Sequence, residues 1–376
     1  MLPRRGAAAA AAAVAALLSL AAAAPPRPAF IKGVDASSIG SLDCDGACPK
    51  FKWDASSPPS DALQQLARAG VNTLRVRLWN DPVPEAAYAN LTGVLALARR
   101  ATSAGLALWL DPHYSDTWAD PAHQAKPRAW AALGGAELVA AVYNFTHAAV
   151  DALVAQGTPP YVVQTGNEID GLGMLVNGTG QPCSAGGAID AHCSANWPML
   201  GALVAAGQRA VRAACPSALL AIQSFRGSHL ATPTGAAEIT WFFSRLVAAG
   251  GGGFDIAAFS FYPESAPCPC RLDAWAALNN VTAALPPGTR LTIAETSYPW
   301  SNTARPPLPP GEFPYSQAGQ AAYVQAALRT MATAVGDRGV GVIWWGTEIV
   351  AGYGLGLTAL WDESYVGTEA LRTGWQ

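Results

Sequence analysis

Short apolar runs rich in β-branched and aromatic residues alternate along the chain with longer stretches in which apolar residues recur at helical spacing. The eight runs that have the length of buried strands are 30–37, 71–79, 106–114, 161–168, 219–224, 256–263, 291–298 and 340–347. The seven clearest helix-like stretches are 61–70, 92–105, 138–157, 197–215, 238–250, 272–285 and 316–336. Several of them end in glycine, a common C-terminal stop. This alternation predicts a closed barrel of eight parallel strands surrounded by helices.

An open, doubly wound sheet is the alternative architecture for the same alternation. Its first strand would normally be followed by a glycine-rich loop that binds phosphate. Here the turn from Asp35 to Gly40 reads DASSIG, which lacks that pattern. The Pro-rich patches, such as 306–310, are short enough to be loops, so no linker divides the chain. We therefore predict an α/β fold, a single (β/α)8 TIM barrel that spans residues 25–376 as one domain.

The first 24 residues have the organisation of a secretory signal peptide. Arg4 and Arg5 precede an apolar run from Ala7 to Ala24, and small residues end that run before Pro25. A membrane anchor is the alternative, because the run is just long enough to span a bilayer. Alanine is a weak membrane former, however, and the small-residue end suits a signal peptidase. We predict cleavage near Pro25 and a secreted protein that has no membrane attachment after cleavage.

Charge and cysteine content agree with this prediction. The formal net charge is only −3, with no long run of either sign, which argues against nucleic acid or an anionic membrane as partner. In an oxidising compartment the near pairs Cys44/Cys48 and Cys183/Cys193 would form small disulfide loops, and one of the seven cysteines must remain unpaired. Four glycosylation sequons are present, at Asn90, Asn144, Asn177 and Asn280. We expect an extracellular glycoprotein that is a monomer.

Two glutamates stand out at the predicted carboxyl ends of the strands, where the active site of such a barrel lies. Glu168 ends the fourth run and Glu295 lies near the end of the seventh, so the two carboxyl groups should meet at the barrel mouth. Glycoside hydrolysis needs an acid that protonates the leaving oxygen and a carboxylate that attacks, ~5–5.5 Å apart in a retaining enzyme. Either residue alone could instead cap a helix or join an ion pair. Together they predict Glu168 as catalytic acid/base and Glu295 as nucleophile.

Polar residues near these glutamates are candidates for contacting substrate or the nucleophile. Asn167 is placed to donate a hydrogen bond to a sugar 2-hydroxyl. Arg75 and Tyr262 could keep the nucleophile ionised by hydrogen bonding to it. His113 and Asp116, next to Asp111 in the third strand segment, are further candidates for substrate contact, although a structural role is the alternative for the histidine.

Aromatic residues supply the remaining candidates. Trp118 lies in a polar loop and Trp345 at a strand end, so we expect both indoles to stack on sugar rings. Trp79 and Trp344 are more typical of a core, where large aromatic residues are usually found.

Two segments resemble metal sites, but neither has a full ligand set. The stretch 43–46 reads DCDG like the start of a calcium loop, but no glutamate follows at the required spacing. Cys183, His192 and Cys193 could suggest zinc, yet a fourth ligand is not evident and the compartment is oxidising. We therefore expect no metal and no other cofactor.

At these residues the sequence resembles the endo-β-1,4-galactanases, glycoside hydrolase family 53 of clan A. The most specific stretch is 111–130, which reads DPHYSDTWADPAHQAKPRAW. Further matches follow in the family's order: GVDAS from Gly33, RVRLWNDP from Arg75, TGNEI from Thr165, SFYP from Ser260, AETSYP from Ala294, and Gln320. The resemblance covers essentially the whole mature chain and implies the acid/base role for Glu168 and the nucleophile role for Glu295.

Three segments depart from the family's pattern. Leu175 is followed by Val176 instead of tryptophan, residues 344–347 read WWGT where the family commonly has YWEP, and CPC at 268–270 replaces an aromatic-rich stretch. The resemblance implies a retaining endo-glycosidase that hydrolyses internal β-1,4-galactosidic bonds of galactan or type I arabinogalactan. The departures leave open a related β-glycanase acting on another glycan, such as mannan or xylan. A weakly active glycan-binding barrel is the third hypothesis.

Overall fold

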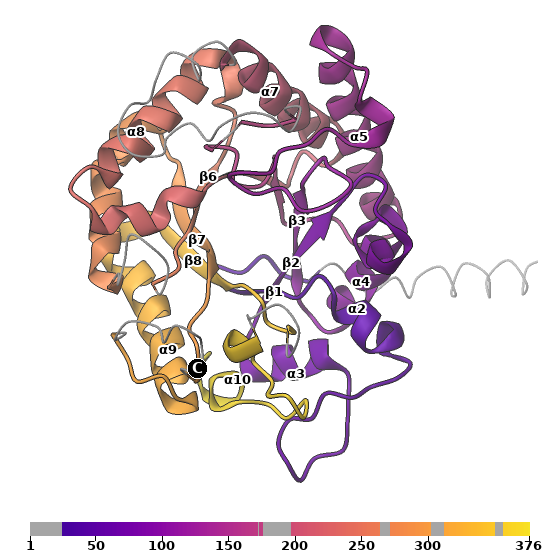
Figure 1. Ribbon diagram of the computed structural model, residues 1–376, viewed down its shortest axis with the longest axis vertical. Helices are drawn as coiled ribbons and strands as arrows, with labels where there is room; N and C mark the ends of the chain where they lie inside the picture. The colour runs from indigo at the N-terminus through magenta and orange to yellow at the C-terminus, as the bar shows by residue number, and fades with distance from the viewer. Residues whose placement is uncertain (1–24, 172, 176–196, 264–270, 302–311, 350–355) are drawn as a thin grey trace, which may run out of the picture.

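The computed structural model describes residues 25–171, 173–175, 197–263, 271–301, 312–349 and 356–376. Eight parallel strands form a closed barrel in which each strand pairs with the next along the chain (Figure 1). Pairing of Ile31 in the first strand with Gly341 in the last closes the ring. The strands are β1 Ile31–Asp35, β2 Thr73–Leu78, β3 Ala107–Pro112, β4 Val162–Gln164, β5 Leu219–Ser224, β6 Ile256–Ser260, β7 Arg290–Thr296 and β8 Gly339–Trp344. The predicted (β/α)8 barrel is confirmed.

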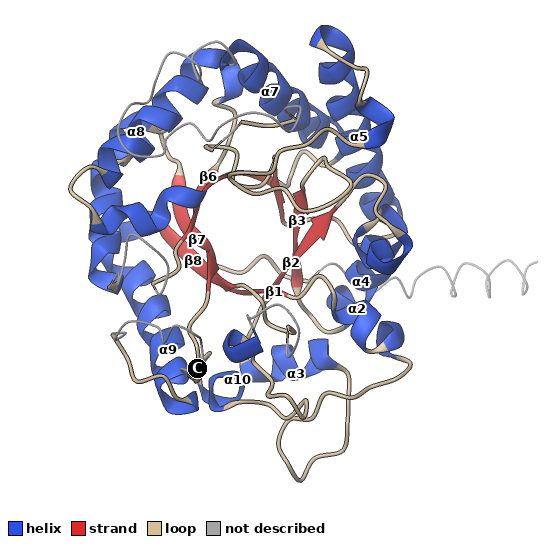
Figure 2. Ribbon diagram, in the orientation of Figure 1, coloured by secondary structure: helices blue, strands red, loops and turns tan. Residues whose placement is uncertain are grey.

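Helices surround the barrel on its outside (Figure 2). The longer ones are α3 Ala62–Ala69, α4 Leu91–Ser103, α5 Gly135–Ala155, α7 Trp197–Ala214, α8 Gly235–Leu246 and α9 Gln317–Ala334, and the short ones are α2 Ile39–Leu42 and α10 Glu369–Thr373. By length and composition α5 could cross a membrane, but it packs against α4 and α7 around the barrel.

The helix-like stretch 272–285 forms no α-helix. It is two 3-10 helices, η6 Leu272–Asn280 and η7 Thr282–Ala284. The side-chain amide of Asn279 donates to the carbonyl of Ala276, and the hydroxyl of Thr282 donates to the carbonyl of Asn279. Side chains that bond to nearby backbone carbonyls in this way compete with the α-helical ladder, which explains the tighter turns.

The ends of α3 illustrate how the sequence sets the helix boundaries. The carboxylate of Asp61 accepts from the backbone N–H groups of Leu63 and Gln64, which caps the first turn. Gly70 ends the helix in the left-handed conformation at φ 103°, and a Cβ there would lie 3.0 Å from the carbonyl oxygen of Trp375. Only glycine meets both conditions without strain.

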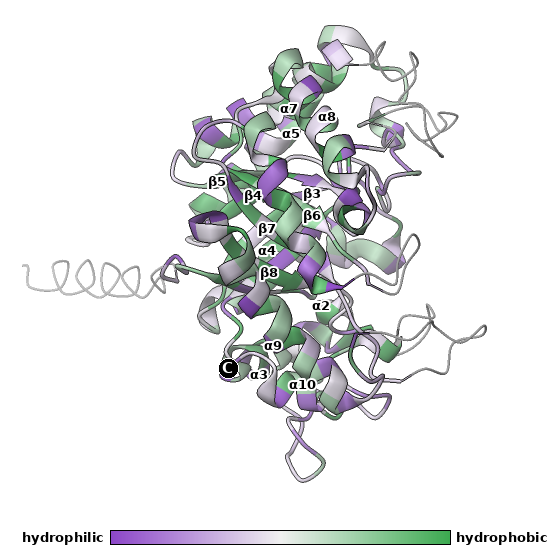
Figure 3. Cartoon of the chain, turned by 90° about the vertical axis from the view of Figure 1, so that its left-hand side faces the viewer, coloured by the Kyte–Doolittle hydropathy of each residue, from purple (hydrophilic) through white to green (hydrophobic). Residues whose placement is uncertain are grey.

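The barrel interior holds a small apolar core beneath the strand ends. It consists of the inward-facing residues Ile31, Ala107, Trp109, Val162, Ala221, Ile256, Ala258, Ala294 and Ile343, with Tyr161. A larger apolar cluster fills the layer between strands and helices, and the hydrophobic colouring of the strands within the molecule is visible in Figure 3. Above the inner core, the indole N–H of Trp109 donates to the side-chain oxygen of Gln164 at 3.2 Å, where the polar layer begins.

The structure describes three of the seven cysteines. The Cys44–Cys48 disulfide is present, and Cys215 is free and buried. The carboxylate of Asp43, in the segment that resembles a calcium loop, forms an ion pair with Arg100 at 2.7 Å. The predicted signal peptide 1–24, the Cys183/Cys193 pair, Asn177, His192, Val176 and the CPC segment 268–270 lie outside the described residues.

Candidate active site

The predicted acid/base residue lies on a sharply turned segment. We expected the fourth strand to reach Glu168, but β4 ends at Gln164. Gly166 has φ 82° and Glu168 has φ 50°. The chain therefore turns away from the sheet through two residues in the left-handed conformation. A Cβ at Gly166 would lie 2.7 Å from a methyl carbon of Ile169, so another residue would be strained there. A non-glycine residue with positive φ stores strain, and such residues cluster at functional sites.

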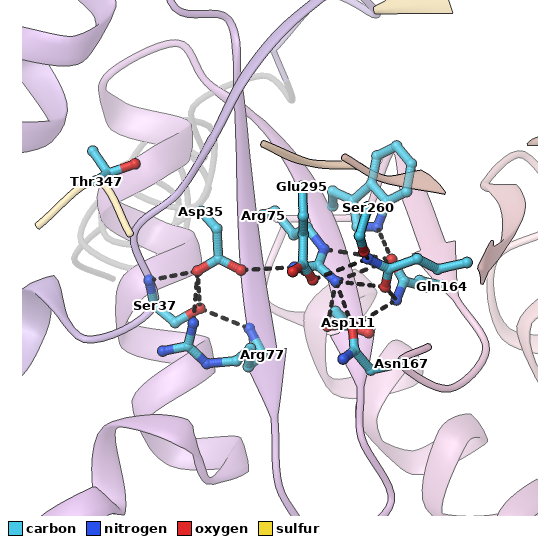
Figure 4. A network of polar contacts seen from close by, with 12 residues as sticks. Asp35, Ser37, Arg75, Arg77, Asp111, Gln164, Asn167, Ser260, Glu295 and Thr347 are labelled. Atoms are coloured by element: carbon cyan, nitrogen blue, oxygen red, sulfur yellow. Dashed lines mark hydrogen bonds and ion pairs between the residues drawn. The ribbon is translucent and has the colours of Figure 1, made fainter. Parts of the chain in front are cut away.

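The predicted nucleophile, Glu295, lies within β7 and receives three hydrogen-bond donors. Figure 4 shows one of these donors, Arg75, beside Glu295. Its Oε1 atom lies 2.9 Å from Nη1 of Arg75 and accepts from the side-chain amide of Gln223 at 2.9 Å. Its Oε2 atom accepts from the hydroxyl of Tyr262 at 2.8 Å. All three donors require an acceptor, and an ionised carboxylate offers acceptors only. The network therefore holds Glu295 as a carboxylate in one orientation.

Tyr262 keeps its proton and is a reliable donor in this network. Burial raises the pKa of its hydroxyl well above the ordinary value, and the negative charges of Glu295 and Glu168 raise it further.

Arg75 is the cation that contacts Glu295, and it has no exposed surface. Besides Glu295, it lies 2.8 Å from Asp111 and 3.0 Å from Asp35. Burial disfavours its charge, but these three carboxylates outweigh that effect and raise the pKa of the guanidinium. Arg75 was a candidate for substrate contact or for stabilising the nucleophile, and its geometry fits the second role because it lies beneath Glu295.

Glu168 has the opposite electrostatic environment. It is 8% exposed, and burial raises its pKa well above the ordinary value, with the charge of Glu295 as the next cause. One oxygen accepts a short hydrogen bond from the hydroxyl of Ser260. Two carboxyl groups whose environments favour opposite protonation states are what an acid and a nucleophile need.

Asn167 lies next to Glu168 and is fixed from both ends of its side chain. Its amide donates to the carbonyl of Ala119 at 2.8 Å, and its oxygen accepts from Arg75 at 2.8 Å. The carbonyl of Asn167 accepts from Gln124 at 2.8 Å, which ties the loop after β3 to the Glu168 segment. The amide nitrogen of Asn167 carries two N–H groups, and among the described residues only one of them has an acceptor, so the other remains for a ligand.

The two other polar candidates, His113 and Asp116, occupy different places. Nδ1 of His113 accepts from the backbone N–H of Ala119 and the indole of Trp79, so the proton is on Nε2, which lies 3.0 Å from Asp111. His113 lines the pocket at the site, whereas Asp116 does not. The carboxylate of Asp116 instead accepts from the backbone N–H groups of Asp81 and Arg128 and organises the loop.

The aromatic candidates form a wall. Trp118 is 37% exposed, and its ring centroid lies 6.1 Å from that of Trp345. The ring of Trp345 meets Tyr262 edge-on at 6.3 Å. Trp79 and Trp344 are buried, at 3% and 1% exposure, as expected for core residues. The exposed indole of Trp118 and the half-buried indole of Trp345 give the pocket an apolar face of the kind on which sugar rings stack.

A pocket of about 540 Å³ opens at this end of the barrel. Glu168, Glu295, Asn167, His113, Trp118 and Trp345 line it together. No role was assigned from the sequence to the other residues of its lining that carry polar groups, namely Ser38, Ser41, Arg77, Tyr88, Asp120, Glu348 and Tyr365. Their position in the sequence could have identified several of them, because they follow the carboxyl ends of β1, β2 and β8.

Comparison with known proteins gives a consistent result. The model of glycosyl hydrolase family 53 matches residues 31–372. An arabinogalactan endo-beta-1,4-galactanase of Cellvibrio japonicus is 31% identical over 327 residues, which cover 84% of this chain and 80% of that protein.

Two solved structures are similar along nearly their whole length. The GH53 catalytic domain of Ignisphaera aggregans has a TM-score of 0.76 and 28% identity, covering 94% of this chain and 97% of that chain. A structure from a study of two fungal beta-1,4-galactanases has a TM-score of 0.77 and 26% identity, covering 92% of this chain and 99% of that chain. With a family match that runs from β1 to α10, this chain belongs to glycosyl hydrolase family 53 and is a glycoside hydrolase.

Proposed function

We propose that this protein is an extracellular, retaining endo-β-1,4-galactanase that cleaves internal bonds of galactan or type I arabinogalactan. The observation that carries the proposal is the pair of glutamates in unlike environments. Glu295 is held by three donors, whereas burial and the charge of Glu295 raise the pKa of Glu168. Support for the substrate comes from relatives that are named as galactanases and share the family and the fold.

In the first step a carboxylate oxygen of Glu295 attacks the anomeric carbon, and the bond from that carbon to the leaving oxygen breaks. Glu168 transfers its proton to the departing oxygen, which leaves as a hydroxyl group. The product of this step is a galactosyl ester of Glu295. The remaining N–H of Asn167 is available to the 2-hydroxyl of the sugar, where hydrogen bonding strengthens as the transition state forms.

In the second step water attacks the same carbon and releases the sugar with its original configuration. The charge of Glu295 is absent from the ester, so one cause of the raised pKa of Glu168 disappears. Glu168 is then ready to accept the proton of the attacking water, as a general base must. Burial therefore favours the protonated acid form of Glu168 in the first step, and loss of the charge of Glu295 favours the ionised base form in the second.

The two other hypotheses make different predictions in one experiment. The protein is incubated with debranched β-1,4-galactan, mannan and xylan, and the products are separated by length. Our proposal predicts short galacto-oligosaccharides from internal bonds of galactan and, in the first turnovers, β-configured reducing ends by NMR. Cleavage of mannan or xylan with galactan untouched would favour the related β-glycanase. Binding of galactan without turnover would favour the glycan-binding barrel.

We further propose that the protein is secreted after cleavage near Pro25 and acts as a monomer. The leader-like segment 1–24 and the Cys44–Cys48 disulfide support secretion, since disulfides persist in oxidising compartments. N-terminal sequencing of protein from the culture medium of a eukaryotic host, with light scattering for its mass, tests both points. A retained leader or a dimer would contradict them.

A further inference from the structure

Glu348 is a third carboxyl group in the pocket, and the mechanism above does not use it. It follows β8 at a segment where the sequence departs from the family's pattern. The residue is 1% exposed and lines the same pocket as Glu168 and Glu295.

Only one of the two carboxyl oxygens of Glu348 has a partner in the described part of the chain. Its Oε1 atom accepts from the backbone N–H of Ser38 at 2.8 Å and from the hydroxyl of Ser38 at 2.5 Å. Its Oε2 atom is buried and has no hydrogen-bond partner among the described residues. Buried polar atoms of folded proteins are nearly always hydrogen-bonded, so a missing partner needs an explanation.

Arg77, another residue of the pocket lining, has a buried donor without an acceptor among the described residues. Its Nη1 atom lies 2.9 Å from Asp35, and its guanidinium lies 4.2 Å from the ring centroid of Trp118. Its Nε–H is buried and, within the described ranges, also lacks an acceptor. Burial raises the pKa of Glu348 above its ordinary value, and the charge of Arg77 opposes that rise. Burial disfavours the charge of Arg77, but the carboxylates of Asp35 and Glu348 outweigh burial and raise the pKa of its guanidinium.

In the part of the chain that the structure describes, the atom of Arg77 without a partner is a donor, that of Glu348 is an acceptor, and the two do not bond to each other. Both residues line the pocket, and a hydroxyl group both accepts and donates, so one hydroxyl that reaches both atoms would complete both hydrogen bonds. Sugars offer such hydroxyls next to apolar ring faces. Trp118 presents an apolar surface beside Arg77, because the guanidinium covers one side of the indole and the ring is still 37% exposed.

We propose that Arg77 and Glu348 form a hydroxyl-binding subsite for a galactosyl unit of the bound chain, with the ring of that unit against Trp118. One hydroxyl accepts from Nε of Arg77 and donates to Oε2 of Glu348. This inference rests on the proposed galactanase function and adds to it a specificity-determining pair. Arg77 and Glu348 bind the chain and take no part in bond cleavage.

The main test is Glu348→Gln, with Glu363→Gln as the matched control. Glutamine keeps an oxygen for Ser38 and replaces the free acceptor with an N–H donor that cannot accept from the sugar. On galactan and on galactotriose to galactohexaose we expect KM to rise about tenfold or more, the loss typical of a hydrogen bond to a charged group, with kcat nearly unchanged. Glu363 is exposed and lies outside the pocket lining, so its variant should behave like the unaltered protein.

A second measurement separates binding from a structural role. A set of monodeoxy galacto-oligosaccharides is assayed with both proteins. Removal of one particular hydroxyl should raise the KM of the unaltered protein by about tenfold. The same removal should change the KM of Glu348→Gln much less, because the partner of that hydroxyl is already gone.

The outcomes are distinguishable. If the unaltered protein does not cleave galactan, the proposed function fails. If it does, but Glu348→Gln has unchanged KM and responds equally to every deoxy sugar, this inference is overturned. In that case Glu348 only anchors Ser38, and a water molecule fills the position of the hydroxyl.

Discussion

Replacing Arg75 with methionine should destabilise the protein strongly, and the effect should depend on pH. Arg75 is fully buried and lies within 3.0 Å of Asp35, 2.8 Å of Asp111 and 2.9 Å of Glu295. Methionine fills much of the same volume but leaves these carboxylates without their common cation. Breaking one buried ion pair costs about 3–5 kcal/mol, a large part of the ~5–15 kcal/mol that stabilises a typical domain.

The pH dependence follows from the direction of the pKa shift of Asp111. Burial alone would raise that pKa, but Arg75 and His113 outweigh burial and hold it below its ordinary value of 3.8. A lowered pKa contributes stability that is present above pH 3.8 and is lost as pH falls through the native-state value. Without Arg75, burial raises the pKa of the carboxyl, and protonation in mild acid then relieves the repulsion. The loss of stability in Arg75→Met should therefore be largest near pH 7 and smaller near pH 4.

Urea unfolding at pH 7 and pH 4 measures both effects. Arg75→Lys keeps a positive charge with fewer donors, so it should lose less stability than Arg75→Met. The surface pair between Arg128 and Asp81, at 2.9 Å with both side chains mostly exposed, supplies a matched control. Arg128→Met should change the free energy of unfolding by at most ~1 kcal/mol. If Arg75→Met lost equal stability at both pH values, packing and not charge would explain the effect.

Two further predictions concern binding and proton transfer. Trp118→Ala should raise KM for galactan about fivefold, as expected from ~1 kcal/mol of lost aromatic contact, and should lower kcat less; an unchanged KM in steady-state assays would indicate that Trp118 only packs. Ser260→Ala removes the hydrogen bond that lowers the pKa of Glu168, so the alkaline limb of the kcat/KM profile should move to higher pH. Movement of that limb to lower pH would contradict the acid role of Glu168.

The fold was predictable because buried strands and amphipathic helices leave clear periods in the sequence. The strand ends were less predictable. Glu168 lies four residues beyond β4, because Gly166 and Glu168 adopt left-handed conformations that turn the chain before the apolar pattern ends. The 3-10 helices after residue 271 arise from side chains such as Thr282 that bond to nearby carbonyls, a competition that apolar periodicity does not report.

Part of the site could be predicted because active-site residues of such barrels lie near the carboxyl ends of the strands. Glu295 and Trp345 were chosen as candidates on this basis. The interior polar layer escaped prediction. Gln223 receives a hydrogen bond from Arg75 and donates one to Glu295, but in the sequence it is an ordinary strand residue whose direction depends on barrel register. Asp116 is close in sequence to His113, but its carboxylate accepts from the backbone N–H groups of Asp81 and Arg128, and the residue is not part of the pocket lining.

The roles of the two glutamates are the central claim, and azide rescue tests them most directly. Glu295→Ala and Glu168→Ala are assayed with an activated aryl galactoside that the cleft accepts, after melting curves show that both variants fold. Without its nucleophile, Glu295→Ala cannot form the galactosyl ester. Glu168→Ala can form it, because the activated leaving group needs no proton, but water then lacks its general base.

Azide should attack the ester in Glu168→Ala from the face that water uses and give the β-galactosyl azide. In Glu295→Ala, azide should occupy the position of the missing carboxylate and give the α-azide. The configuration of each product, read from its anomeric coupling constant by NMR, is the decisive measurement. The β-azide from Glu168→Ala together with the α-azide from Glu295→Ala is the predicted result; the reverse configurations would exchange the two roles, and unimpaired hydrolysis by both variants would contradict the active site itself.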